Sequence, residues 1–366
     1  MPTLLKTVIQ DWRNITLQEI EFSPKMNCIS GGNGEGKTNL LDAVYYLSMT
    51  RSSLSTSDKY NYRRGCDSFA LAGSYLMEDG KETRYTMRSS SGADKKLMKD
   101  GKQYTRISDH IGEIPIVMVS PSDSDLISDS SECRRRFCNS CLSQMDKEYL
   151  ATVQRYNKYL ASRNALLKQD NPGSGEVLES INARLSLLAQ SIYERRAEFT
   201  RGIGPLLSKY YSLISGGREN VDISYRSDLD KGSLESQLAA SYERDRILGY
   251  TTAGIHRDDF IFSMEGDPIR KIGSEGQQKS FLIALKFSQN ELMRSRYGYP
   301  PILLLDDLFD KLDPERSSNL LSMVSGKDFG QIFISDTDKE RIERSLANAV
   351  PDALFLHAQG GAFTKQ

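Results

Sequence analysis

One stretch, residues 26–50, constrains the fold of this chain more than any other: MNCISGGNGEGKTNLLDAVYYLSMT. A short apolar run leads into a glycine-rich turn, and apolar residues at helical spacing follow it. The turn matches the phosphate-loop pattern G-x-x-x-x-G-K-[ST], with the strand before it and the helix after it that the pattern requires. Backbone N–H groups of such a loop point at phosphate, and the helix start adds a positive end. The stretch therefore predicts a nucleotide phosphate site built by Gly31, Gly32, Asn33, Gly34, Glu35, Gly36, Lys37 and Thr38.

A second pattern supplies acidic partners for that loop. Residues 301–307, PILLLDD, read as a buried strand that ends in two carboxylates, the Walker B pattern of nucleotide hydrolases. Lys37 is expected to reach the β- and γ-phosphates, whereas Thr38 and Asp306 are expected to hold Mg²⁺, Asp306 through water. Asp307 is placed to orient or deprotonate the attacking water. ATP and Mg²⁺ are thus the expected cofactors, and Lys37, Asp306 and Asp307 the expected catalytic residues.

A third feature is the polar turn 273–277, GSEGQ, which precedes a helical pattern that runs to Arg296. Ser274, Gly276 and Gln277 put anion-binding groups at the start of this helix. The helix at Gly36 already serves the chain's own phosphates, so the second helix start offers an unused anion site. In proteins that this pattern resembles, such a turn binds the nucleotide of a second subunit, and the same is expected here. The loop 312–314, Leu-Asp-Pro, is expected to cross the interface between two such subunits. Phosphate loop, polar turn and Walker B strand, in this order, are the arrangement of ABC-type ATPases.

The remaining pattern places these motifs in an α/β architecture. Strand patterns occupy residues 3–10, 15–22 and 26–30, and short alternating runs from 69 to 119 predict an antiparallel sheet beside the nucleotide core. Helical patterns cover 131–168 and 176–211, with a breaker at 171–175, and predict a projecting helical hairpin. The predicted fold is an ABC-type ATPase head, a phosphate-loop mixed sheet plus an antiparallel β-subdomain, with an inserted helical arm. The expected domains are an ATPase lobe at 1–120, the arm at 121–220 and the second part of the ATPase core at 221–366.

The amino-acid composition says more about the cellular environment of the protein than about its function. The 366 residues carry a net charge of −1 with a pI near 6.4, so any nucleic-acid contact must use a local basic face. No apolar run approaches the ~18 residues of a membrane span, and residues 1–14 lack a signal-peptide core. An odd number of cysteines, five, without an export signal favours reduced thiols in the cytoplasm. Cys133, Cys138 and Cys141 have one iron–sulfur spacing, but no fourth cysteine follows, so a cluster is not expected.

Two groups of basic residues are candidates for a DNA-contacting face. Three arginines stand at the start of a predicted helix, and four lysines lie on a predicted hairpin. Such side chains are more often solvated surface charges than phosphate contacts, by about three to one. Both interpretations stay open for Arg134, Arg135, Arg136, Lys95, Lys96, Lys99 and Lys102.

Over essentially its whole length, the chain resembles the RecF family of bacterial DNA recombination and repair ATPases. The resemblance is carried by Trp12-Arg13-Asn14, the loop from Gly32 to Asn39, Ser120-Pro121, Arg134-Arg135 with Phe137, Gly254 to Asp259, Ser274 with Gly276-Gln277-Gln278, and Leu304 to Asp313. The carboxylate at Asp307 separates this pattern from transporters, which usually carry Glu there. The chain departs from the family where Ser131 stands in place of a Gly-Pro element and Asn139 in place of an Asp. The switch histidine that other ABC ATPases often place near residues 335–337 is missing as well.

The resemblance implies an ATP-dependent homodimer that binds double-stranded DNA, favours gapped or junction DNA, and works with RecR and RecO to load RecA. A weak, DNA-stimulated hydrolysis of ATP to ADP and phosphate is expected. Two alternatives stay open: a nucleotide-gated scaffold with negligible turnover, and a transporter-type ABC ATPase subunit. The resemblance adds to the expected nucleotide-binding residues Arg13, Asn14 and Asn39 in the same chain, with Ser274, Gly276 and Gln277 acting in trans.

Overall fold

The computed structural model describes residues 1–169, 175–308, 312–326, 328–338 and 352–366. Most of the expected breaker at 171–175 and residues 309–311 after the Walker B pattern lie outside this part. No helix within the described ranges is long and apolar enough to cross a membrane. The described chain forms two compact units: unit 1 comprises Met1–Ser124, Tyr210–Arg218 and Ser274–Gln366, and unit 2 comprises Asp125–Lys209 and Glu219–Gly273.

The first sheet of unit 1 carries the nucleotide motifs. Its strand order is β15-β14-β3-β13-β12-β8, in which all neighbours pair in parallel except the antiparallel pair β14 and β15. Strands β3, β12 and β13 are buried along their whole length, as expected for parallel strands that are covered on both faces. The bounds are β3 Met26–Ser30, β8 Ile116–Val119, β12 Ile302–Asp306, β13 Ile332–Asp336, β14 Leu354–Gln359 and β15 Ala362–Lys365.

Strand β8 corrects the sequence analysis, which placed its residues in the antiparallel sheet. It pairs in parallel with β12, from Ile116 beside Ile302 to Val119 beside Leu305. All four of its residues are buried. A continuous apolar run without alternation is typical of a parallel strand covered on both faces, and this feature of IVMV outweighs the position of the strand directly after a hairpin.

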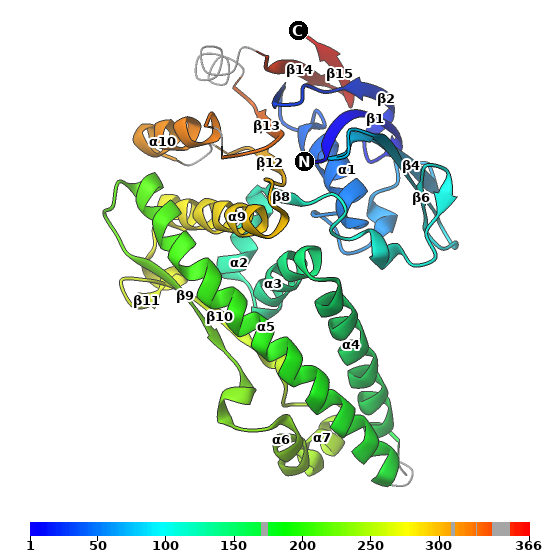
Figure 1. Ribbon diagram of the computed structural model, residues 1–366, viewed down its shortest axis with the longest axis vertical. Coiled ribbons are helices and arrows are strands. Elements are labelled where there is room, and N and C mark those ends of the chain that lie inside the picture. The colour runs from blue at the N-terminus through cyan, green and yellow to red at the C-terminus, as the bar shows by residue number, and fades with distance from the viewer. Residues whose placement is uncertain (170–174, 309–311, 327, 339–351) are drawn as a thin grey trace. The chain divides into compact units, whose positions relative to one another are not determined.

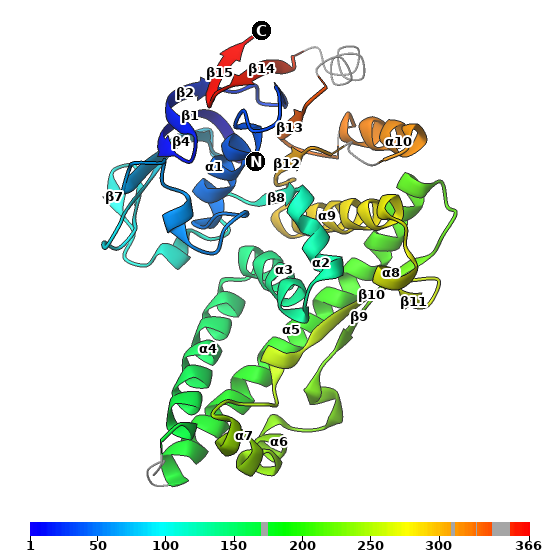
Figure 2. The same ribbon diagram turned by 180° about the vertical axis from the view of Figure 1, so that it is seen from behind.

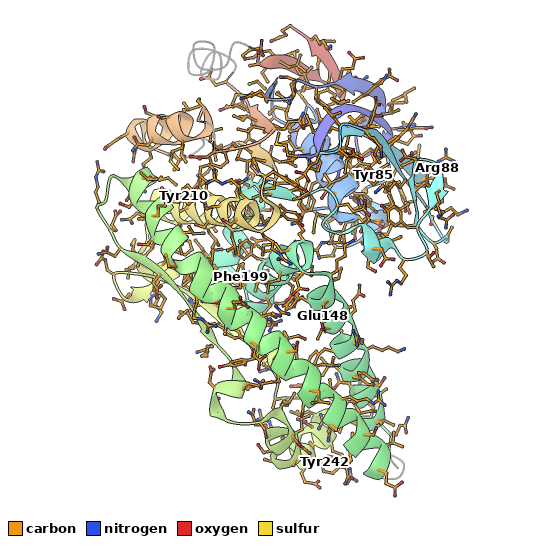
Figure 3. All side chains as sticks on the ribbon, viewed as in Figure 1. Tyr85, Arg88, Glu148, Phe199, Tyr210 and Tyr242 are labelled. Atoms are coloured by element: carbon orange, nitrogen blue, oxygen red, sulfur yellow. The ribbon has the colours of Figure 1, made fainter. Side chains whose placement is uncertain are left out.

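The second sheet of unit 1 is antiparallel, with the order β2-β1-β4-β5-β6-β7. Helix α1 contacts strands of both sheets, so the helix that follows the phosphate loop lies in the hydrophobic core of unit 1 (Figure 1). Tyr85 of β5 is buried in this core, whereas Arg88 of the same strand is exposed at its outer side (Figure 3). The bounds are β1 Thr3–Trp12, β2 Ile15–Glu21, α1 Lys37–Met49, β4 Ser68–Leu76, β5 Glu82–Ser90, β6 Lys96–Lys99, β7 Lys102–Gln103, α9 Glu275–Tyr297 and α10 Pro314–Val324.

Unit 2 combines a helical hairpin with a small sheet of order β11-β10-β9. Helices α4 and α5 lie side by side in both views (Figures 1 and 2), and Arg163 of α4 donates to Asn182 of α5 over 2.8 Å. The predicted helical hairpin is therefore confirmed. The bounds are α2 Asp125–Ser128, α3 Ser131–Met145, α4 Lys147–Leu167, α5 Gly175–Ser215, β9 Val221–Arg226, α6 Leu234–Ala240, α7 Tyr242–Leu248, β10 Asp259–Met264, β11 Asp267–Pro268 and α8 Ile269–Ile272.

Asp146 divides the helix that the sequence predicts over 131–168 into α3 and α4. Its backbone is extended, with φ −142° and ψ 103°. Its carboxylate accepts hydrogen bonds from the N–H groups of Glu148 and Tyr149 at 2.9 and 3.0 Å. An aspartate N-cap of this kind satisfies N–H groups that have no partner inside a helix. Apolar periodicity continues across the cap, which is why the sequence analysis missed the break.

Buried ion pairs explain why residues 219–273 group with the arm helices, although the sequence analysis assigned 221–273 to the ATPase core. Each pair joins a helix of 125–209 to a carboxylate of 219–273. Removing one partner of a buried pair typically costs ~3–5 kcal/mol, so the two segments are strongly coupled. The pairs are Arg134 with Asp259 at 2.8 Å, Arg163 with Asp245 at 2.7 Å, and Arg196 with Asp258 at 2.7 Å.

Candidate nucleotide-binding and hydrolysis site

The phosphate loop joins β3 to α1 through backbone angles that favour glycine. Gly31, Gly34 and Gly36 have φ of 152°, 80° and 110°. A Cβ on Gly31 would lie 2.5 Å from the carbonyl oxygen of Ala358, and one on Gly36 would lie 2.9 Å from the side chain of Asn14. The backbone conformation disfavours larger residues at all three positions, and close packing against backbone excludes them at Gly31 as well. The loop that the sequence predicts has therefore the form that aims backbone N–H groups at an anion.

Lys37 lies at the centre of this loop and is only 4% exposed. Its Nζ donates to the carbonyl oxygens of Gly31 and Gly32 at 2.7 and 2.9 Å. These bonds hold the ammonium group against the backbone of the loop. A bound phosphate oxygen could accept from the same ammonium group, which has three N–H donors.

Thr38 connects the loop to the end of β12. Its hydroxyl donates to Oδ1 of Asp306 at 3.0 Å, and the Ser335 hydroxyl donates to the same oxygen at 2.6 Å. Asp306 is 2% exposed, and burial raises the pKa of its carboxyl group despite these two hydrogen bonds. A buried carboxylate beside a hydroxyl is an oxygen site of the kind that Mg²⁺ uses. The structure thus brings together the two side chains that the sequence predicts as metal-binding.

Asp307 differs sharply from its neighbour in conformation. Its φ is 44°, a left-handed value that costs a non-glycine residue roughly 1–2 kcal/mol. The backbone N–H donates to the Ser335 hydroxyl at 3.1 Å, and the carbonyl oxygen accepts from Nζ of Lys279 at 2.9 Å. Strained backbone persists only where surrounding contacts hold it, and these two contacts act on both sides of the residue.

Ser274 is the N-cap of α9 and is exposed. Its hydroxyl accepts from the N–H of Gln277 at 3.3 Å, and Oε1 of Gln277 accepts from the N–H of Ser274 at 2.8 Å. This reciprocal arrangement is a capping box. The sequence analysis expected an unused anion site at this helix start. Within the chain the Ser274 hydroxyl and N–H bind Gln277, and a contact of Ser274, Gly276 and Gln277 with the nucleotide of a second subunit stays a prediction.

The turns 13–14 and 360–361 contact the phosphate loop from outside. Asn14 accepts from the side chain of Asn39 at 2.7 Å and donates to the carbonyl oxygen of Gly34 at 3.4 Å. The N–H of Gly361 donates to the carbonyl oxygen of Glu35 at 2.9 Å, and the N–H of Gly360 donates to the Glu35 carboxylate. Two segments from opposite parts of the sequence therefore position the loop.

Arg13, a predicted nucleotide contact, is engaged elsewhere. Its Nη2 donates to Asp42 at 3.1 Å, to Ser52 at 2.9 Å and to Asn61 at 3.0 Å. These bonds fasten the turn after β1 to α1 and to the segment that follows it. A direct contact of Arg13 with nucleotide stays a prediction.

Arg316 ties α10 to the start of α9. Its guanidinium is 7% exposed and donates to the Ser280 hydroxyl at 2.7 Å and to the carbonyl oxygen of Gly276 at 3.2 Å. Asp313 caps α10 by accepting from the N–H of Arg316 at 2.8 Å. The expected interface loop at 312–314 is thus joined to the turn that carries Ser274, and its part in an interface stays a prediction.

Comparison with known proteins identifies the family. Residues 3–351 match the RecF/RecN/SMC N-terminal domain family. The DNA replication and repair protein RecF of Parabacteroides distasonis is 42% identical over 358 residues and covers 98% of each chain. The protein of the same name from Bacteroides thetaiotaomicron is 42% identical over 363 residues, which are 99% of this chain and 98% of the relative. The chain belongs to the RecF family.

Comparison with solved structures supports the same family assignment. A structure titled recombination mediator protein RecF-ATP in the RecFOR pathway aligns with a TM-score of 0.90 at 27% identity and covers 100% of this chain and 98% of its own. The Smc head domain from Pyrococcus furiosus shares the fold, with a TM-score of 0.59 at 14% identity and coverage of 100% and 96%. The predicted ABC-type ATPase head with an inserted helical arm is confirmed. As a RecF protein the chain acts in DNA replication and repair, and its relatives favour neither the scaffold nor the transporter alternative.

The basic side chains that were candidates for DNA contact in this RecF protein have different surroundings. Lys95 forms an ion pair with Asp58 at 2.7 Å, and Lys99 forms one with Glu113 at 2.8 Å. Arg134 is neither solvated nor available to phosphate, because it is 9% exposed and paired with Asp259. The side chains that remain exposed are Lys96, Lys102 and Arg136.

Sequence reasoning missed several residues that shape this RecF site. The sequence analysis expected no role for Ser335, Lys279 or Arg316. Serine, lysine and arginine at such places match no motif. The available signal for Ser335 was its position directly after the apolar run 332–334, because the carboxyl ends of parallel strands meet at one edge of a sheet, as those of β12 and β13 do.

Proposed function

We propose that this chain binds Mg²⁺ and ATP and that ATP gates its dimerisation and its retention on DNA. The hydrogen bond of 3.0 Å from the Thr38 hydroxyl to the Asp306 carboxylate supports the proposed Mg²⁺–ATP site most directly, because it joins the phosphate loop to the end of β12. There, the Thr38 hydroxyl and the Asp306 carboxylate would hold Mg²⁺ together with water. Bound at this place, the ion supplies charge neutralisation for the β- and γ-phosphates.

The proposed reaction is hydrolysis of ATP to ADP and phosphate. Water attacks the γ-phosphorus, the bond from that phosphorus to the β–γ bridging oxygen breaks, and the Asp307 carboxylate accepts a proton of the water. Lys37 would donate to phosphate oxygens in place of the carbonyl oxygens of Gly31 and Gly32. Asp306 must be ionised for the metal to bind, so its raised pKa predicts that Mg²⁺ affinity increases with pH until this carboxyl group is deprotonated.

The proposed dimer uses Ser274 of each subunit. Its cap is exposed, and Gln277 can yield the hydroxyl and N–H of Ser274 to a stronger acceptor such as a γ-phosphate of the partner's nucleotide. Two equivalent contacts form in a two-fold dimer, because its interface is self-complementary. Each charge-assisted hydrogen bond contributes about 1.5–3 kcal/mol, so two sites shift a weak association by several powers of ten.

The relatives support the proposed DNA function and its partners. Those named RecF are DNA replication and repair proteins, and the solved structures are described as recombination mediators in the RecFOR pathway. For this chain we propose double-stranded and gapped DNA as ligands, and RecO and RecR as partners. Arg88 and Lys96 face each other across β5 and β6, and both are exposed, which makes them the first candidates for phosphate contact.

Light scattering with a slowly hydrolysed ATP analogue and Mg²⁺ tests the proposal. The wild type is expected to become a dimer, and Ser274→Arg to remain a monomer that still binds the analogue. Ser233→Arg is the matched control, because Ser233 is also an exposed serine N-cap but belongs to α6 of unit 2. The control should dimerise and retain gapped DNA as the wild type does. A wild type that stays monomeric, or a Ser274→Arg protein that dimerises, contradicts the proposal.

A further inference from the structure

Lys279 connects two parts of the site that act on different nucleotides in the proposed dimer. It lies in α9, five positions after the N-cap Ser274, and is half-buried. Its Nζ reaches the carbonyl oxygen of Asp307 at 2.9 Å. The start of α9 would face the partner's nucleotide, whereas Asp307 would serve the nucleotide on the chain's own phosphate loop.

The hydrogen bond from Lys279 acts on Asp307, the residue that would activate the attacking water in the proposed reaction. Asp307 has a φ of 44°, and this backbone angle decides where its carboxylate points relative to Asp306. The N–H of Asp307 is held by Ser335, which also binds Asp306. On the other side of Asp307, Lys279 donates to its carbonyl oxygen. If its ammonium group moves, the peptide after Asp307 loses a charge-assisted donor, and the strained conformation loses support.

Hydrogen bonds brace the first turns of α9, which carry both Ser274 and Lys279. Arg316 donates to Ser280 at 2.7 Å and to the carbonyl oxygen of Gly276 at 3.2 Å, on either side of Lys279 in the sequence. Ser280 in turn donates to Gly276 at 2.8 Å. Contact of the Ser274 turn with a phosphate would therefore hold this braced helical turn in place, and with it Nζ of Lys279 at the carbonyl oxygen of Asp307.

We propose that Lys279 is a positioning residue that holds Asp307 in its hydrolytic conformation and makes this depend on the partner's nucleotide at Ser274. The inference rests on the proposed ATP-gated dimer and adds a mechanism for communication between its two sites. Each subunit would then hydrolyse its own ATP efficiently only when its α9 start is engaged by the other subunit's nucleotide. Single-site hydrolysis in a partly loaded dimer is thereby suppressed.

The first test separates binding from turnover in Lys279→Met, which keeps the length of the side chain and removes its charge. We expect the affinity for the ATP analogue and the analogue-driven dimer to remain as in the wild type. The kcat for ATP should fall by about 10- to 100-fold, as small displacements of catalytic groups commonly cause. Lys279→Arg, which restores a charged donor, should recover most of the rate. If Lys279→Met folds poorly in a thermal melt, Lys279→Gln serves in its place.

Lys286→Met is the matched control from the same helix. Like Lys279, Lys286 donates from α9 to a backbone carbonyl oxygen, that of Met118 in β8, at 2.7 Å. Its ion pair is with Asp123, and neither of these two contacts involves Asp307. We expect this variant to melt at a lower temperature while a folded sample keeps the wild-type kcat. A loss of kcat in both variants would show a structural effect of α9 and would overturn the proposal.

A double-mutant cycle tests the dependence on Ser274. In dimers saturated with ATP, Ser274→Ala and Lys279→Met should lower kcat non-additively, so that the double variant is no slower than the slower single variant. Ser274→Ala combined with Lys286→Met should be additive. Wild-type kcat in Lys279→Met, or independent effects in the first cycle, overturns the inference and leaves the proposed function intact. Dimerisation of the wild type is measured independently by light scattering, and its failure would instead contradict the proposed function.

Discussion

Asp306 and Asp307 are adjacent carboxylates with different surroundings. Asp306 is buried and receives hydrogen bonds from Thr38 and Ser335, whereas Asp307 is half-exposed in a left-handed backbone conformation. A buried carboxylate that shares its oxygen with a threonine hydroxyl suits a metal ion. A half-exposed carboxylate one residue later can meet a water molecule. The division of roles proposed for the two carboxylates therefore rests on their burial and backbone angle.

Asp307→Asn is expected to separate ATP binding from hydrolysis. The amide keeps the size of the side chain but cannot accept a proton, so kcat should fall by about 10²- to 10⁴-fold. Affinity for Mg²⁺ and ATP should stay near that of the wild type, because the group acts on turnover more than on ground-state binding. Asp306→Asn should instead raise the Mg²⁺ concentration that ATP binding requires. Steady-state kinetics and Mg²⁺ titrations measure both, and an unimpaired rate in Asp307→Asn would contradict its catalytic role.

At the scale of elements, the β14–β15 hairpin is part of the nucleotide site. Its turn donates from Gly360 and Gly361 to Glu35, and β14 packs so closely on the loop that Gly31 has no room for a side chain. The phosphate loop is thus held by a hairpin that lies more than three hundred residues later in the chain. Such support keeps the loop in its binding form before nucleotide arrives and lowers the entropy lost on binding.

Gly361→Ala tests this support. The new Cβ would lie 2.3 Å from the carbonyl oxygen of Asn14, in a backbone with φ of 83°. We expect about tenfold weaker binding of a fluorescent ATP analogue, together with a lower melting temperature. Gly101→Ala is the control, because Gly101 has φ of 80° in another hairpin turn with no atom within 4 Å of the new Cβ. The control should lose about 1 kcal/mol of stability from backbone strain alone and keep its affinity. Equal affinities in the two variants would count against the role of the hairpin.

At the scale of the whole molecule, the two parts of the site should respond to nucleotide under different conditions. In the proposed dimer, the phosphate loop would bind ATP within one chain, whereas the start of α9 would meet phosphate only when two chains associate. Hydrogen exchange with an ATP analogue should therefore show protection at 31–38 at low and high protein concentration. Protection at 274–280 should appear only at high concentration. In Ser274→Arg the second region should stay unprotected, and protection of both regions in a monomer would contradict the trans arrangement.

The phosphate loop, the Walker B strand and the class of the fold could be predicted from the amino-acid sequence alone. These features depend on short-range order: glycines at the places where the loop needs them, a lysine and a threonine at the helix start, and apolar runs of strand length. The same local signals produced the helical hairpin. They are readable without a structure because neighbouring residues cooperate in one element.

The distant residues that complete the site could be recognised only in the folded chain. Ser335, Lys279 and the turn at Gly360 match no motif, and each acts by donating one hydrogen bond to a residue far away in sequence. The same holds for β8, whose partner strand lies about 180 residues later, and for Arg134, whose charge is neutralised by Asp259. A single hydrogen bond or ion pair leaves no periodic trace in the sequence, so its partner is known only when packing brings the two groups together.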